Sequence, residues 1–358
     1  MSKKLMLYGA NGYTSRLIIK ELVGQNIKPI LAGRSKEKIN NLAEKHGFDS
    51  SIFSLAKTKV IDEKLNNIDV LINAAGPYSL TAKPLIDSCI RTKTHYIDIT
   101  GEIDVFVYAE SKHKDAKDAG IIVCPGVGFD VIPTDCLSYL LKDKMPDANE
   151  LNICFFSENG RPSIGTAKTS IEGLSNGGRI RKNGKIEQVP LAHSVKEIDY
   201  GQGSRMAMSI PWGDVATAYY STGIENIIVY TPRSEAGIKK IRKHRKWLFI
   251  LKLKFVQNYL KNKMTKKIIN GGDSDEQRAK SKMWVWAEVK NKDGKIESGH
   301  FQIANGYDVT GYGAMFFAKQ LIENTFEGGY YTPSLLLRPN IVESLESLPG
   351  FSGIKFSN

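Results

Sequence analysis

Short apolar runs alternate with segments of helical periodicity over residues 1–126. The apolar runs predict strands at residues 5–10, 28–34, 51–55, 69–76, 95–99 and 120–126. Between them, apolar positions recur at helical spacing in residues 14–23, 36–46, 83–92 and 104–119. Strands that alternate with helices of this length predict βαβ units and a parallel sheet. We therefore expect an α/β fold that begins with a doubly wound, Rossmann-type domain.

From about Leu151 the pattern changes to strand-like runs separated by Gly- and Ser-rich turns, at residues 152–156, 195–199, 206–212, 226–232, 282–290 and 297–304. This pattern predicts a second α+β domain. Two helical patterns follow Ala314, and we expect them to pack back on the first domain. The predicted domains are therefore residues 1–128, 129–320 and 321–358.

The composition limits the class of protein. The chain has 358 residues, 41% of them apolar, which excludes a disordered chain and suits about two domains. Its four cysteines form no C-x-x-C pair, so we expect neither a metal site nor a disulfide framework. No apolar run approaches the roughly 18 residues of a membrane span, and the N-terminus lacks a cleavage site. These features predict a cytoplasmic protein.

The positive charge of the chain is concentrated in one segment. Residues 239–267 hold 12 Lys and Arg and no Asp or Glu, which equals the whole net charge of +12. Residues 247–260 within it are amphipathic at helical spacing, with Trp and Phe on the apolar side. Such a segment fits an anionic membrane surface, which would place the protein peripherally at the inner membrane. The alternative is a helix packed on the protein's own core. No nucleic-acid-binding motif accompanies the charge, so we expect no nucleic-acid partner.

A dinucleotide-binding motif follows the first predicted strand and opens the first helix. It is a GxxGxxG variant with serine in the last position, and its candidate cofactor-binding residues are Gly9, Asn11, Gly12, Tyr13, Thr14 and Ser15. The first glycine permits a tight turn, and the second lets the backbone approach a pyrophosphate at the helix N-terminus.

The second strand distinguishes between the two nicotinamide cofactors. It ends in Gly33, Arg34 and Ser35 instead of the Asp or Glu that holds the ribose of NAD. A guanidinium and a hydroxyl suit a 2′-phosphate, so we predict NADP(H). The fourth strand ends in small residues that let the backbone approach the nicotinamide ribose, namely Ala74, Ala75, Gly76 and Pro77.

Five motifs, in order and spacing, resemble the saccharopine dehydrogenase-like family: GANGYTS, LAGRS, NAAGPY, THYIDITGE and PGVGFDVIPTD. The likeness is closer to its branch of trans-acting enoyl reductases and saccharopine dehydrogenase-like oxidoreductases, which IGTAKTS, IPWGD, STGIENIIVY and GGYYTPSLLL also resemble. The resemblance implies an NADP-binding Rossmann domain, a second α/β domain and hydride transfer to a lipid-like, isoprenoid or polyketide substrate. Ser15 and the basic segment 239–267 depart from the family pattern.

The sequence indicates a proton donor less clearly than a cofactor site. The candidate catalytic residues are Tyr78, Asp98, Glu102 and Asp130, all near predicted strand ends or the domain junction. Tyr96 should point to the same face as Asp98. Asp135 fits a helix cap as well as an acid–base role. Tyr108 and Lys112 have the spacing of a short-chain dehydrogenase pair but lie on a charged helix.

Three functions remain open at this point. The first is an NADPH-dependent reductase of an unsaturated, hydrophobic small molecule. The second is an amino-acid-type dehydrogenase resembling saccharopine dehydrogenase. The third is a non-catalytic NADP-binding protein at a membrane. A homodimer is compatible with each of them.

Overall fold

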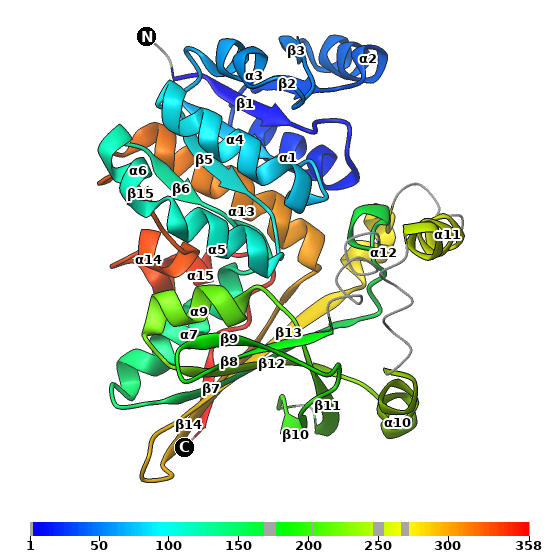
Figure 1. The fold of residues 1–358 in the computed structure, drawn as a ribbon, viewed down its shortest axis with the longest axis vertical. Coiled ribbons are helices and arrows are strands. Elements are labelled where there is room, and N and C mark those ends of the chain that lie inside the picture. Colours follow the sequence, from blue (N-terminus) through cyan, green and yellow to red (C-terminus); the bar gives the residue numbers. More distant parts are fainter. Residues whose placement is uncertain (1–2, 168–176, 202, 246–253, 266–271, 358) are drawn as a thin grey trace. The chain divides into compact units, whose positions relative to one another are not determined.

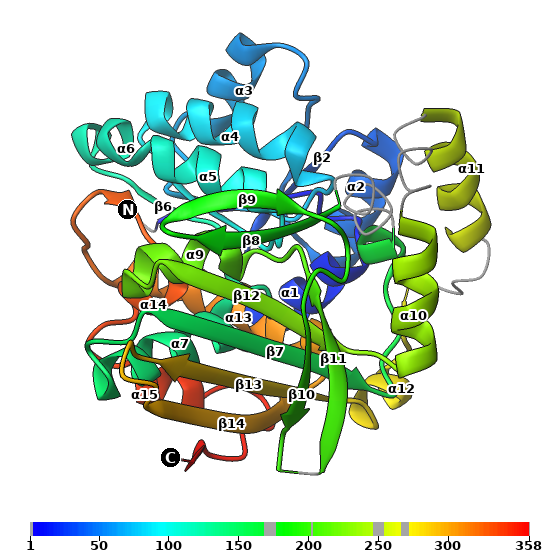
Figure 2. The same cartoon turned by 60° about the horizontal axis from the view of Figure 1, so that its bottom comes forward.

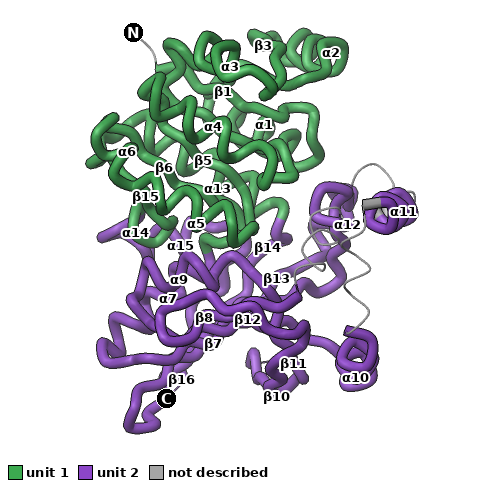
Figure 3. Tube along the Cα trace, in the orientation of Figure 1, with its two compact units in different colours: residues 1–132, 307–336 green, residues 133–306, 337–358 purple. Residues whose placement is uncertain are grey.

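The computed structural model describes residues 3–167, 177–201, 203–245, 254–265 and 272–357. The chain forms two compact units, and each contains two stretches of sequence (Figure 3). Unit 1 comprises residues 1–132 and 307–336, and unit 2 comprises residues 133–306 and 337–358.

Unit 1 is built on a parallel sheet, as the alternation of strands and helices predicts (Figure 1). Its strand order, β15-β6-β5-β4-β1-β2-β3, is that of a doubly wound fold with one added strand. Every neighbouring pair is parallel. The strands are β1 (Leu5–Tyr8), β2 (Ile30–Gly33), β3 (Ser50–Ile52), β4 (Val70–Asn73), β5 (His95–Asp98), β6 (Ile122–Cys124) and β15 (Gly329–Tyr330). Their central residues are fully buried because helices cover both faces.

The helices of unit 1 are α1 (Tyr13–Gly24), α2 (Lys36–His46), α3 (Thr58–Leu65), α4 (Tyr78–Thr92), α5 (Ile103–Ser111), α6 (His113–Ala119), α13 (Gly306–Glu323) and α14 (Pro333–Leu336). Right-handed crossovers place α1 and α4 on opposite faces, because β1 to β2 and β4 to β5 run in opposite directions across the sheet. The single helix expected over residues 104–119 is divided at Lys112. Helix α4 begins at Tyr78, five residues before the pattern predicted.

The C-terminal return differs from the predicted segment 321–358. Residues 307–336 join unit 1, whereas residues 337–358 join unit 2. The physical reason is strand pairing, because β15 extends the parallel sheet beside β6 and β16 (Lys355–Ser357) pairs with β14 (Ile296–Ala304). Helix α13 packs on α1, where a β-carbon at Gly311 would lie 3.1 Å from Leu17 Cβ.

Unit 2 contains one mixed sheet among its described residues, in the order β10-β11-β12-β7-β13-β14-β16 (Figure 2). A hairpin of β8 and β9 joins this sheet through β12. The remaining strands are β7 (Glu150–Glu158), β8 (Gly178–Lys182), β9 (Lys185–Val189), β10 (Val195–Asp199), β11 (Ser204–Ile210), β12 (Asn226–Pro232) and β13 (Lys282–Lys290). The sequence pattern did not indicate β8 and β9, because each strand contributes few apolar residues and is rich in Gly, Arg, Lys, Glu and Gln, although β8 is largely buried.

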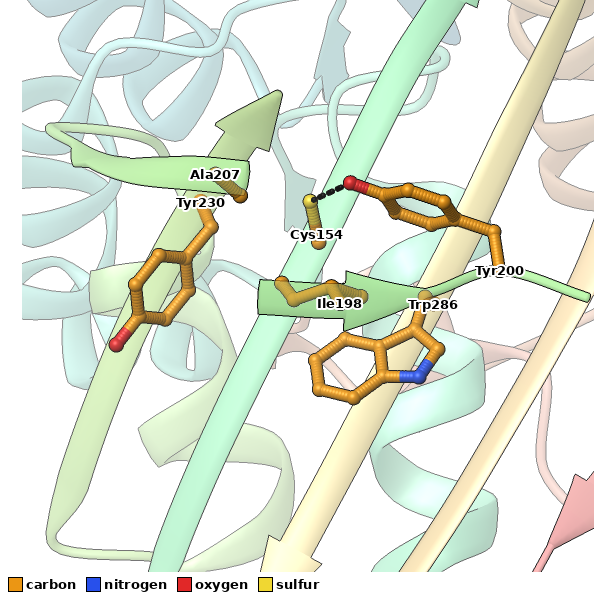
Figure 4. Packing of buried hydrophobic residues seen from close by; sticks show 6 residues of the cluster. All are labelled: Cys154, Ile198, Tyr200, Ala207, Tyr230 and Trp286. Carbon is orange, nitrogen blue, oxygen red and sulfur yellow. Dashed lines mark hydrogen bonds between the residues drawn. The ribbon is translucent and has the colours of Figure 1, made fainter. Parts of the chain in front are cut away.

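The helices of unit 2 are α7 (Ile132–Lys144), α9 (Asp214–Thr222), α10 (Glu235–His244), α11 (Lys254–Thr265), α12 (Asp275–Ala279) and α15 (Ile341–Glu346). One face of the sheet carries a buried cluster around Cys154, Tyr200 and Trp286 (Figure 4). The Cys154 Sγ lies 3.5 Å from the Tyr200 hydroxyl, and burial raises the pKa of this thiol to about 12. The cysteine is therefore a protonated core residue at neutral pH.

Among the helices of the described ranges, none has the length and apolar character of a membrane span.

Gly328, just before β15, provides a test of how the added strand is held. A β-carbon there would lie 2.9 Å from Gly120 Cα and 3.0 Å from both Ala116 O and Ile121 N, which are all backbone atoms. We expect Gly328→Ala to lower the free energy of unfolding by about 1–3 kcal/mol, because backbone cannot yield as a side chain can. Denaturant unfolding measures the change.

Gly24→Ala is the matched control, because nothing lies within 4 Å of its added β-carbon at the end of α1. This variant should be neutral or stabilising by up to about 1 kcal/mol. Equal effects of the two substitutions would contradict the close packing of β15.

Candidate functional site

The loop after β1 has the geometry of a phosphate-binding turn. Gly9 adopts a φ of +84°, and a β-carbon there would lie 2.8 Å from Ala75 Cβ. The Gly12 amide donates to the Gly9 carbonyl over 3.0 Å, and the Ser15 hydroxyl donates to the same carbonyl over 2.9 Å. Ser15 is fully buried. Ser15, in the last position of the motif, therefore stabilises the loop through its own side-chain hydrogen bond.

The N-terminus of α1 is suited to an anion. Gly12 is its N-cap, no side chain caps the helix, and its first turn has no acidic residue. Such a terminus combines backbone N–H groups with the positive end of the helix dipole. Asn11 is exposed and Thr14 is partly exposed beside it, whereas the Tyr13 ring packs edge-to-face on Tyr307 at 5.2 Å. The Tyr13 ring is therefore engaged by Tyr307.

The end of β2 carries an exposed positive charge. Arg34 is exposed, and its guanidinium has no hydrogen-bond or ion-pair partner among the described residues. Ser35 is the N-cap of α2, but its hydroxyl makes no capping bond. Burial raises the pKa of Tyr8, at the end of β1, and the charge of Arg34 opposes this rise. The guanidinium thus lies within electrostatic reach of the Tyr8 hydroxyl, on the strand that leads into the glycine loop.

The end of β4 approaches the glycine loop through backbone. The Ala74 amide donates to the Tyr8 carbonyl over 2.9 Å, and the Ala75 amide donates to Asn73 Oδ1 over 3.1 Å. Ala74 and Ala75 are half-buried, and Gly76 is exposed. The small residues predicted for the cofactor site therefore lie against Gly9, as expected from the carboxyl edge of a parallel sheet.

A buried chain of polar groups links β4, β5 and the loop after β6. The Asn73 Nδ2 donates to the Tyr96 hydroxyl over 3.1 Å, and that hydroxyl donates to Asp98 Oδ2 over 2.7 Å. The Thr100 and Gly126 amides each donate to Asp98 Oδ1 over 3.0 Å. Asn73, Tyr96 and Asp98 are fully buried. This set, hereafter the Asn73–Tyr96–Asp98 network, fixes the spacing of three strand ends.

Burial of the Asp98 carboxyl disfavours its charged form. Burial raises its pKa to about 6, although the bonds from Tyr96, Thr100 and Gly126 lower it. The prediction that Tyr96 and Asp98 share one face is confirmed by their hydrogen bond. Because the accepting oxygens already receive three donors, the geometry suits Asp98 to positioning the strand ends.

Glu102, a predicted catalytic residue, is hydrogen-bonded to the backbone at the start of α4. Its two oxygens accept the Tyr78 amide over 2.9 Å and the Ser79 amide over 2.8 Å. The carboxylate therefore caps the N-terminus of α4, a position that the helix dipole favours. The Tyr78 side chain is buried, and desolvation, with Asp98, Glu102 and Asp130 nearby, raises its pKa well above 10. Tyr78 consequently stays a hydrogen-bond donor at neutral pH.

Asp130 is the site carboxyl that is suited to exchange a proton. Burial raises its pKa to about 7, and no hydrogen-bond partner of its carboxyl occurs among the described residues. The carboxyl lies against Gly101, where a β-carbon would be 2.9 Å from Asp130 Oδ2. The residue retains partial exposure. Its charge also raises the pKa of Tyr78, so the two side chains are electrostatic neighbours.

The other acid–base candidates lie outside this group. Asp135 belongs to unit 2, where the Ser221 hydroxyl donates to it over 2.5 Å. The Tyr108 hydroxyl donates to Asp87 and receives the Lys83 ammonium over 2.9 Å. Lys112 instead pairs with Asp115 over 2.8 Å. Tyr108 and Lys112 thus do not form the pair that their spacing suggested.

No group of three or more His, Cys, Asp or Glu within the described ranges could hold a metal ion. Of the network residues, Asn73 was not among the predicted site residues, and Tyr96 was considered only as the neighbour of Asp98 on the same strand. Their signal in the sequence was a polar side chain near the end of an otherwise apolar strand.

Comparison with known proteins agrees with this geometry. Residues 5–124 match the saccharopine dehydrogenase NADP-binding domain family. This NADP-binding domain covers the glycine loop, Arg34 and the Asn73–Tyr96–Asp98 network, so the predicted cofactor is confirmed.

Two curated relatives share part of the chain. The human saccharopine dehydrogenase-like oxidoreductase is 28% identical over 215 residues, which cover 52% of this chain and 50% of the relative. The chain therefore spans about half the length of that relative. A trans-acting enoyl reductase of Mycobacterium ulcerans (strain Agy99) is 30% identical over 144 residues, which cover 37% of this chain and 34% of that protein.

The fold extends beyond the NADP-binding domain. The apo saccharopine dehydrogenase (L-Glu forming) of Saccharomyces cerevisiae covers 100% of both chains with a TM-score of 0.66 at 14% identity. At this identity the likeness is one of fold. It confirms the predicted class, a parallel-sheet domain followed by a second sheet domain.

The raised pKa of Asp98 predicts a pH-dependent contribution to stability. Because the folded pKa of about 6 lies above the ordinary range, the contribution is greatest in acid and is lost as the pH rises through about 6. Asp98→Asn removes the titrating group. We expect the stability advantage of the wild type over this variant to be about 1 kcal/mol larger at pH ~5 than at pH ~7.5.

Urea unfolding of both proteins at the two pH values measures this difference. The variant should be the less stable at both, because an amide leaves one of the donors around Asp98 without an acceptor. A stability difference that does not change with pH would contradict the titration of Asp98.

Proposed function

We propose that the chain is an NADPH-dependent oxidoreductase that reduces an unsaturated, enoyl-type bond in a hydrophobic small molecule. The observation that carries the cofactor part is Arg34 at the end of β2, an exposed guanidinium with no hydrogen-bond or ion-pair partner among the described residues. The substrate class is supported by the names of the relatives, which include trans-acting enoyl reductases.

The residues at the carboxyl edge fit a dinucleotide. A β-carbon at Gly9 would fill the space against Ala75, and the α1 N-terminus has no side-chain cap. The pyrophosphate would be held by the backbone of Gly9 to Ser15, and the 2′-phosphate by Arg34 and Ser35. When bound, NADPH supplies the hydride. Ala74 to Pro77 provide the small-residue edge for the nicotinamide ribose.

Reduction of a carbon–carbon double bond consumes one hydride and one proton, so the protein must supply a proton. Asp130 suits this role because a pKa of about 7 keeps a substantial fraction protonated at neutral pH. Tyr78, with its strongly raised pKa, keeps its proton and can donate a hydrogen bond to an acyl oxygen. Asp98 and Glu102 act through position, the first by fixing strand ends and the second by capping α4.

Arg34→Ser tests the cofactor assignment. Loss of a charged hydrogen-bond donor should weaken NADPH binding by about 10- to 100-fold and change NADH binding by less than about twofold. Calorimetric titration with each cofactor measures both affinities. Lys45→Gln, an exposed charge loss at the other end of α2, should leave both unchanged. Equal NADPH affinity in Arg34→Ser and wild type would contradict the 2′-phosphate role.

Asp130→Asn tests the proton donor. We expect kcat for NADPH oxidation with an unsaturated acyl substrate to fall about 100-fold, while NADPH affinity is retained. The wild-type rate of reduction should decrease as the pH rises above about 7, because the acid form of Asp130 is consumed. Asp118→Asn, an exposed carboxyl elsewhere in unit 1, serves as the control.

The substrate panel distinguishes the alternatives. Turnover of 2-oxo acids with amines, and none of unsaturated acyl compounds, would favour an amino-acid-type dehydrogenase. NADPH binding without turnover of any member would favour a non-catalytic NADP-binding protein.

A further inference from the structure

Helix α10 presents lysines outward from unit 2. Its Ile238 and Ile241 pack in a cluster with Ala192 and Met208. Arg242 anchors the same side of the helix, since its Nε donates to the Ala192 carbonyl over 3.0 Å. At 100° per residue, Lys239, Lys240 and Lys243 project on the opposite side, and all three are exposed.

Helix α11 exposes aromatic residues where a helix packed on its own core would bury them. Phe255 is 71% exposed and Tyr259, one turn later, is 64% exposed. Val256 and Leu260, on the other side, are half-buried. The apolar arc expected over residues 247–260 is therefore divided, and its aromatic part points to solvent. Residues 247–253 of that arc lie outside the described residues.

Charge and aromatic exposure occur on the same side of unit 2. Figures 1 and 2 both place α10 and α11 along one flank of this unit, beyond β11 and β12. Helix α11 and residues 239–244 of α10 belong to residues 239–267, which contain 12 basic and no acidic residues. Glu235, in the first turn of α10, lies 3.9 Å from the Lys239 ammonium in an exposed ion pair. The remaining sequence is balanced, with 38 basic and 38 acidic residues after these 12 are subtracted from 50. Eight of these 12 basic residues lie in α10, at its C-cap Arg245, or in α11 within the described part of the chain.

The exposed lysines of α10 and the exposed aromatic rings of α11 together indicate which kind of partner could bind these two helices. An anionic bilayer attracts juxtaposed lysines and also accepts Phe and Tyr rings at headgroup depth. A nucleic acid would satisfy the lysines but would need aromatic rings arranged to stack on bases within a basic groove. The exposed rings of α11 lie on the convex surface of a single helix, which suits a planar interface.

We propose that α10 and α11 form a docking surface for an anionic phospholipid membrane. Lys239, Lys240 and Lys243 face the lipid phosphates, and Phe255 and Tyr259 enter the interfacial region. Docking is reversible and salt-sensitive, because two rings and a few lysines give far less affinity than a membrane-spanning helix. Docking brings α10 and α11 to a lipid surface and does not require turnover.

Vesicle co-sedimentation of the full chain tests the proposal. The probes are phosphatidylcholine vesicles with and without about a third phosphatidylglycerol. We expect binding to the anionic vesicles at least about tenfold stronger than to the neutral ones, and reversal by salt at about 0.5 M. The double variant Phe255→Ser/Tyr259→Ser and the triple variant Lys239→Gln/Lys240→Gln/Lys243→Gln should each lose about tenfold or more.

Matched controls separate the flank from exposed residues in general. Leu80→Ser removes an apolar side chain that is also 71% exposed, but in unit 1. Lys45→Gln/Lys59→Gln/Lys64→Gln removes three exposed lysines of unit 1. Both controls should bind vesicles as the wild type does. NADPH binding and circular dichroism verify that every variant folds.

Three outcomes would overturn the proposal. They are equal binding to neutral and anionic vesicles, equal losses in the control and flank variants, and stronger salt-sensitive binding to duplex DNA than to anionic vesicles. Each is independent of the proposed reductase activity, which the vesicle assay does not measure.

Discussion

The Asn73–Tyr96–Asp98 network is the constraint on which the candidate site depends. Three residues from β4 and β5 hold one another and two backbone amides in a fully buried position. A buried polar group without a partner costs more than a satisfied one gains, so the network has one favourable arrangement. That arrangement sets where the loops after β4, β5 and β6 leave the sheet. The backbone at Ala74 and Ala75, which lies against Gly9, inherits its position from this network.

Four acidic or phenolic side chains near strand ends differ in their hydrogen bonds and in the direction and cause of their pKa shifts. Asp98 and Glu102 are both engaged by backbone amides, which fixes them in place. Asp130 has no such engagement among the described residues, and burial alone raises its pKa. Tyr78 is surrounded by these acids and remains protonated. Similar side chains thus differ in hydrogen bonding and in pKa.

The two units divide the chemistry of the chain. Unit 1 holds the NADP-binding domain and all of the candidate proton-transfer residues that we retain. Unit 2 holds the aromatic core around Cys154 and the basic flank of α10 and α11. On α10, Ile238 and Ile241 pack against Ala192 and Met208, and the exposed lysines lie on the other side of the helix. Cofactor binding and surface docking can therefore be tested separately.

The sequence by itself determined the features that depend on neighbours along the chain. The glycine loop, the uncapped start of α1 and the basic end of β2 were predictable because each is a local pattern at a strand–helix junction. Only the tertiary structure decided which partners distant side chains would find. It paired Glu102 with the amides of α4, joined Asn73 to Tyr96, and divided the C-terminal segment between the two units. These outcomes depend on hydrogen bonds and strand pairings between residues far apart in sequence, which no local periodicity specifies.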